Sequence, residues 1–138
     1  MLWAVVAVLL MFGRVHAYKG EGSEGEMRAT AAIATSITTA NANTEEAKKT
    51  DTTSERREAL ESSNKKLDSK VETLAAKFPE SPKVQAAGGE YWLSRQNLEK
   101  AVTSADRALE LATPDGDPKL TSKALTIKGL AIFQKRGF

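Results

Sequence analysis

The chain has 138 residues, with 20 Lys and Arg against 18 Asp and Glu, and it contains no cysteine. A net charge of +2 is too balanced to indicate binding to nucleic acid or to an anionic membrane surface. The lack of cysteine excludes disulfide bonds and thiolate chemistry. At this length, and with only 6% aromatic residues, the sequence predicts one small domain or a short helical array.

The N-terminus has the pattern of a secretory signal. An uninterrupted apolar run from Leu2 to Phe12 is much shorter than the roughly 20 residues needed to cross a bilayer, but it suits the apolar region of a signal peptide. Val15 and Ala17 fit the small-residue positions before a cleavage site, so we predict a signal peptide over residues 1–17. The expected location is the secretory pathway: secreted, periplasmic or envelope, or the lumen of an organelle. An uncleaved membrane anchor is the alternative, and it is the one expected route to a membrane.

Residues 18–53 read as a linker of low complexity. Glycines occur close together at its start, and Ala, Thr, Glu and Asn dominate from residue 26 onward. Ile33 and Ile37 share one helical face, but few other large apolar residues support them. Because Thr and Asn are mediocre helix formers, we expect a flexible or weakly helical segment.

Four helices are predicted further along the chain. The first covers about 54–78 and has one apolar stripe, interrupted by Ser63 and Asn64. Pro79 and Pro82 end it, since the residue before a proline is biased away from helical angles. Helices over about 82–95, 97–112 and 118–135 follow, and the last of them is capped by Asp117. The predicted fold class is therefore all-α.

Residues 83–114 resemble a tetratricopeptide repeat, a pair of antiparallel helices with small residues where the helices touch. The matching positions are Gly89, Trp92, Ala101, Ala108 and Leu109. A second unit begins forty residues later, with Gly129 at the position of Gly89, and the stripe of helix 54–78 resembles the end of a preceding repeat. The resemblance covers about residues 60–138, as one full and two partial repeats. It implies a short solenoid of stacked helical hairpins over a domain of residues 54–138.

In this family, first-helix residues line a concave groove that receives a peptide or a helix of a partner protein. The resemblance therefore implies an interaction or scaffold module and carries partner-binding roles to Lys83, Ala87, Glu90, Lys123, Ile127 and Leu130. The alternative for each of these positions is an ordinary solvated or packed surface residue.

No enzymatic function is expected. His16, the only histidine, lies in the predicted signal, and neighbouring residues such as Ser69 and Lys70 point to different helix faces. No catalytic, cofactor-binding or metal-binding residue is predicted, because the acidic turn at 115–117 lacks the ligand series of a calcium loop. The competing hypothesis is a structural surface or envelope protein that forms homo-oligomers through a coiled coil at 54–78.

Overall fold

The computed structural model describes residues 2–112 and 116–136, with side chains from residue 24 onward. Over these residues it is all-helical, as predicted, and contains no strand. The five helices are α1 (Leu2–Lys48), α2 (Ser54–Lys77), α3 (Pro82–Ser94), α4 (Leu98–Leu111) and α5 (Pro118–Lys135). The four helices predicted downstream of residue 53 are confirmed to within about a residue at each end.

Each helix from α2 to α5 begins at a side chain that caps it. Thr53, Ser81, Asn97 and Asp117 accept a hydrogen bond from a backbone N–H in the first turn, over distances of 3.0 to 3.2 Å. Proline occupies the start of α3 and of α5, where no backbone donor is needed. These local signals explain why the sequence places the helix starts correctly.

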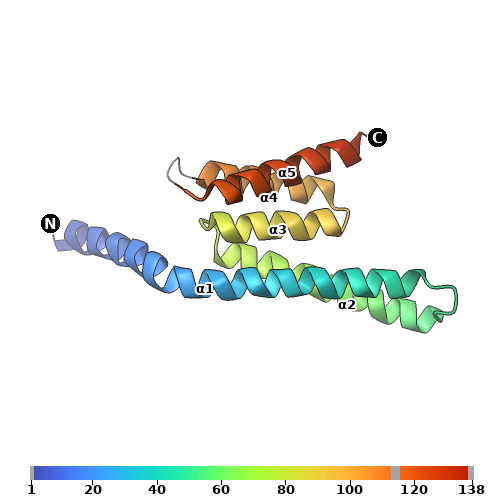
Figure 1. Cartoon of the computed structure of the whole chain (residues 1–138). Coiled ribbons are helices and arrows are strands. Elements are labelled where there is room, and N and C mark those ends of the chain that lie inside the picture. Colours follow the sequence, from blue (N-terminus) through green and yellow to red (C-terminus); the bar gives the residue numbers. More distant parts are fainter. Residues whose placement is uncertain (1, 113–115, 137–138) are drawn as a thin grey trace.

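The helices form successive layers (Figure 1). The α1–α2 hairpin packs against α3, and the α3–α4 hairpin packs against α5. Within the described part of the chain, the backbones of α1 and α2 do not approach those of α4 and α5, although Lys100 of α4 forms an ion pair with Glu72 of α2. Each hairpin therefore contacts only its neighbour in the chain, and α3 is the central helix that touches all the others.

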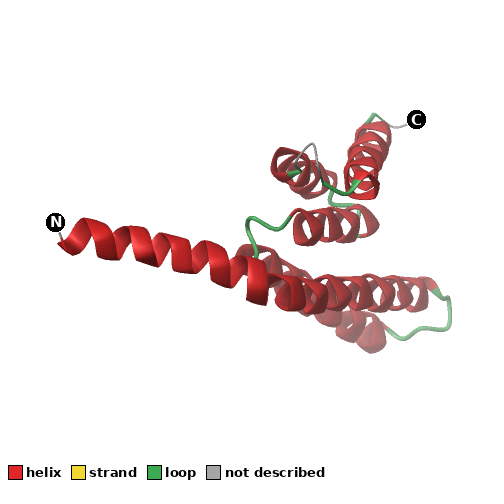
Figure 2. Cartoon of the chain, turned by 60° about the vertical axis from the view of Figure 1, so that its left-hand side comes forward, coloured by secondary structure: helices red, strands yellow, loops and turns green. Residues whose placement is uncertain are grey.

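The main correction concerns residues 18–53. From residue 24 to Lys48 this segment belongs to a regular helix with a buried face formed by Ala29, Ile33, Ser36 and Ala40. The projecting N-terminal part of the same helix extends beyond the other helices (Figure 2). From residue 24 onward the segment is therefore a packed helix and not the flexible or weakly helical linker expected, and it packs on the helices that follow residue 54. The signal-peptide prediction concerns residues whose side chains lie outside the described part.

Hydrogen bonds within the helix satisfy several hydroxyls of the threonine-rich α1, although the buried Thr30 Oγ1 has no partner among the described residues. Ser36 Oγ donates to the carbonyl of Ala32 at 2.9 Å, and Thr35 Oγ1 donates to that of Ala31 at 3.0 Å. Such bonds to the carbonyl four residues earlier satisfy the hydroxyl within the helix itself. A buried serine on the packed face of α1 consequently leaves no unpaired polar group.

Ser63 and Asn64, which interrupt the apolar stripe of α2, face α1. Asn43 Nδ2 donates to Ser63 Oγ at 3.2 Å and to Asn64 Oδ1 at 2.9 Å. On either side of this polar pairing, the apolar stripe of α2 packs inside the molecule, and Leu60 and Val71 are buried. The stripe that suggested an intermolecular coiled coil is thus covered within the chain.

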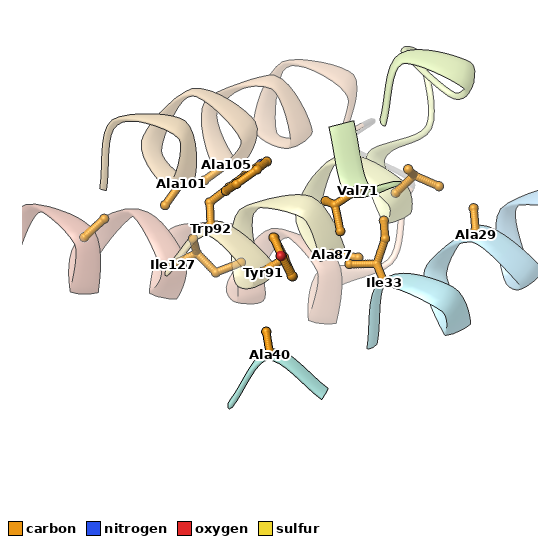
Figure 3. Close-up of a cluster of buried hydrophobic side chains, with 12 residues drawn as sticks. Ala29, Ile33, Ala40, Val71, Ala87, Tyr91, Trp92, Ala101, Ala105 and Ile127 are labelled. Carbon is orange, nitrogen blue, oxygen red and sulfur yellow. The ribbon is translucent and has the colours of Figure 1, made fainter. Parts of the chain in front are cut away.

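The core is centred on α3 (Figure 3). Val84, Ala87 and Tyr91 of α3 lie in one buried cluster with side chains from all the other helices, namely Ile33, Val71, Ala101, Ala105, Ile127 and Ala131 among others. Most of these side chains are small, which lets neighbouring helices approach closely.

Gly89 lies where three helices meet. A Cβ at this position would stand 3.4 Å from the carbonyl oxygen of Ala101, from Ile127 Cγ2 and from Ser104 Cβ. Ala101, Ala108 and Trp92 are buried, and Leu109 packs on the small cluster around Ala108. The residues predicted to mediate close helix packing around Gly89 are therefore found at helix contacts.

Gly129 is an exception. A Cβ built on it would have no atom within 4 Å, because no helix covers that face of α5 among the described residues. The prediction that Gly129 is a packing residue is wrong for this structure.

Candidate interaction groove

An open groove runs between α3 and α5. Its lining residues come from both helices: Glu90 and Leu93 from α3, and Pro118, Lys119, Ser122, Lys123, Thr126, Ile127 and Leu130 from α5. Four of the six predicted partner-binding residues, Glu90, Lys123, Ile127 and Leu130, are thus brought together.

The other two predicted residues are placed elsewhere. Ala87 is buried in the core at 4% exposure, so it cannot contact a partner. Lys83 is exposed in the first turn of α3 but does not line the groove. The binding role expected for Ala87 is wrong, because this position of α3 faces the core.

The groove has an apolar floor and a charged bridge. Ile127 is nearly fully buried and forms part of the floor, whereas Leu130 is 45% exposed at the side. Lys123 Nζ lies 2.8 Å from Glu90 Oε2, and this ion pair joins α5 to α3. Because both side chains are about half exposed, the pair contributes little to stability, about 0–1 kcal/mol. Both charges are therefore available for rearrangement toward a bound chain.

A second cluster of polar residues, not predicted from the sequence, lies between α2 and α3. The hydroxyl of the buried Tyr91 donates to Asp68 Oδ1 at 2.5 Å. Arg95 donates to both carboxylate oxygens of Asp68, at 2.9 Å from Nε and 3.3 Å from Nη2. Tyr91 lies in the last turn of α3 and Arg95 caps its C-terminus four residues later. This spacing of about one helical turn was the one feature of the sequence that indicated the cluster. Their partner on another helix has no signature in the sequence.

Electrostatics holds this cluster in one protonation state. Burial opposes ionisation of Asp68, but hydrogen bonds from Arg95 and Tyr91 outweigh it and keep the pKa of the carboxyl below its ordinary value. Burial and the adjacent carboxylate raise the pKa of Tyr91. Asp68 is therefore ionised and Tyr91 neutral near pH 7. Tyr91 is fully buried, whereas Asp68 and Arg95 are partly exposed, and the cluster joins α2 to the end of α3.

Lys100 of α4 adds contacts to both α2 and α3. It forms an ion pair with Glu72 of α2, and its Nζ lies 4.4 Å from the centroid of the Trp92 ring. The cation covers one face of this indole and supplements the packing between α3 and α4.

The pKa of Asp68 leads to a pH-dependent prediction. Asp68→Asn should lower the free energy of unfolding at pH 7 by about 1–3 kcal/mol, because the charged hydrogen bonds to Arg95 are lost. Since the folded-state pKa lies below the ordinary 3.8, the contribution of Asp68 is complete above that value and is lost as the pH falls below it. Urea titrations between pH 7 and pH 2 should show wild type and variant converging in acid.

Glu58→Gln, on the exposed side of α2, is the matched control and should retain the wild-type pH profile. A constant difference between Asp68→Asn and wild type across the whole pH range would contradict the assigned ionisation.

The described residues contain no group of three or more His, Cys, Asp or Glu side chains arranged to hold a metal ion. From residue 24 onward, where side chains are described, no helix is both long and apolar enough to span a membrane.

Comparison of the chain with protein-family models, with curated proteins and with solved structures found no significant match.

Proposed function

We propose that the chain is a protein–protein interaction module of tetratricopeptide type, whose α3–α5 groove binds a peptide or helix of a partner protein. The groove is the observation that carries this proposal. It combines an apolar floor, the exposed Leu130 and two charged side chains of opposite sign, which suits a segment with mixed apolar and polar side chains.

The packing order of the helices supports the repeat interpretation. Hairpins that contact only their neighbours are the arrangement by which repeat proteins extend. With α1 included, the first hairpin is α1–α2, the second is α3–α4, and α5 begins a third. The preceding repeat, read in the sequence as a partial one, thereby gains the first helix that it lacked.

An internal correspondence between α3 and α5 gives further support. Val84, Ala87 and Tyr91 are buried on the side of α3 that faces the core, and forty residues later Ala124, Ile127 and Ala131 are buried on α5. The same spacing of buried positions on both helices is expected if they are equivalent helices of successive repeats.

The location is part of the same proposal. Export rests on the apolar run from Leu2 to Phe12 and the small residues that follow it. An exported scaffold would present the groove to partners outside the compartment of synthesis. No catalytic role is proposed.

Selection of ligands from a random peptide library on the full chain tests the groove. Selected peptides should bind with 1:1 stoichiometry in a fluorescence anisotropy titration. Leu130→Asp should weaken them at least about tenfold, corresponding to about 1.4 kcal/mol, because it places a charge against an apolar ligand side chain.

Leu125→Asp is the matched control, since Leu125 is another exposed leucine of α5, at 55% against 45% for Leu130, and does not line this groove. Equal loss of affinity in both variants, or no loss in Leu130→Asp, would place the peptides elsewhere and refute the groove.

A further inference from the structure

A second surface of α5 lies on the side of the helix that faces away from its buried positions. Leu125 is 55% exposed and Ile132 is 37% exposed, and Gly129 lies between them on the same face. At positions 125, 129 and 132 these residues follow the spacing of a helix stripe. We call them the outer face of α5. It is distinct from the buried positions Ala124, Ile127 and Ala131.

The outer face corresponds to a surface of α3 that another helix covers. Forty residues separate Gly89 from Gly129, and the same interval separates Trp92 from Ile132. On α3, helix α4 packs so closely that a Cβ on Gly89 would stand 3.4 Å from the backbone of Ala101, and Trp92 is buried. On α5, the equivalent glycine has nothing within 4 Å. The outer face thus has the same small residue for close helix approach, but no helix of the described residues lies on it.

The charge of α5 indicates which kind of helix would fit the outer face. Residues 118–136 contain five basic and no acidic residues: Lys119, Lys123, Lys128, Lys135 and Arg136. Lys123 and Lys128 pair with Glu90 and Asp106, whereas the other three have no acidic partner in the described part of the chain. Two copies of α5 placed face to face would bring these cations together. The charge therefore favours an acidic partner over a second copy.

We propose that the outer face of α5 binds an amphipathic helix of a partner protein that carries small residues along its contact stripe and acidic residues beside it. Helix α4 shows how such a partner would be built. It presents the buried Ala101, Ala105 and Ala108 to its neighbours, and its Asp106 lies 2.7 Å from Lys128 of α5. The surface is separate from the α3–α5 groove, so the chain would engage partners on two sides of one helix.

A synthetic peptide based on α4 tests the proposal. The probe has the sequence of residues 97–112 with Lys100→Glu and Arg107→Glu, so that all its charged side chains are acidic. Its termini are acetylated and amidated, because free terminal charges disfavour a short helix. Anisotropy titration with the full chain should give saturable binding. A peptide whose acidic residues are all replaced by lysine should bind at least about tenfold more weakly.

Two variants of the protein locate the peptide. Gly129→Leu fills the point of closest approach, and Ile132→Asp places a charge in the stripe, so each should weaken binding at least about tenfold. Neither position is buried, and cooperative melting followed by circular dichroism, with no loss of stability in Gly129→Leu, would verify that the fold is intact. Met27→Asp changes an exposed apolar residue on α1 and should leave the affinity unaltered.

Leu130→Asp, the groove variant, should also retain full affinity for the acidic peptide, which separates this surface from the proposed peptide groove. Absence of saturable binding, or equal affinity in Gly129→Leu and wild type, would overturn the proposal. Sedimentation of the full chain as a dimer that Ile132→Asp dissociates would overturn it too, because a second copy would then be the occupant.

Discussion

Replacing Ile33 by alanine is expected to lower the free energy of unfolding by about 2–5 kcal/mol, the range for removing a large aliphatic side chain from a packed core. Ile33 has 0% exposure and lies in the cluster that contains Val71 and Tyr91. The substitution leaves a cavity where α1 meets α2 and α3 (Figure 3). Urea denaturation followed by circular dichroism measures the loss.

Thr38→Ala provides the matched control on the same helix. Thr38 is exposed, and its hydroxyl bonds to the carbonyl of Ala34 within the helix. Its replacement should change stability by less than about 0.5 kcal/mol. If Ile33→Ala behaved in the same way, residues 24–48 would not be packed against the body, and the linker predicted from the sequence would be the better description.

The sequence predicts at most a weak helix over residues 24–48, because the buried face of this helix is made of small residues. Ala29, Ser36 and Ala40 do not produce the stripe of large apolar residues by which amphipathic helices are recognised. Threonine and asparagine also counted against a helix there. In the structure Asn43 is paired across to α2, so its hydrogen bond depends on a residue 21 positions away. Tertiary packing thus overrides the weak local propensity of this segment.

The later helices were predictable because their signals are local. Each of them begins at its own capping side chain, and two of them have a proline in the first turn. These signals do not depend on which helices pack beside them. The candidate groove was predictable in part, because the helix faces that the repeat resemblance assigns include four of its lining residues: Glu90, Lys123, Ile127 and Leu130. Asp68 was not predictable, because the position of its carboxylate beside Tyr91 depends on the crossing of two helices.

A pair of glycines forty residues apart provides the sharpest test of the packing. Gly89→Leu should destabilise the fold by about 3 kcal/mol, at the upper end for an overpacked core, because the new side chain meets the backbone of Ala101 and the side chain of Ile127. Gly129→Leu introduces the same atoms where nothing lies within 4 Å. It should leave stability unchanged or raise it by up to about 1 kcal/mol, since leucine is the better helix former.

Chemical denaturation of the two variants beside wild type measures this difference directly. Because both substitutions are identical and both sites are helical, differences in intrinsic propensity cancel in the comparison. The remaining difference reports whether a helix covers the site. Equal stabilities would mean that α4 does not approach α3 at Gly89, and that α3 cannot serve as the template for a helix on the outer face of α5. A strongly destabilised Gly129→Leu would instead mean that a helix already covers that face in solution.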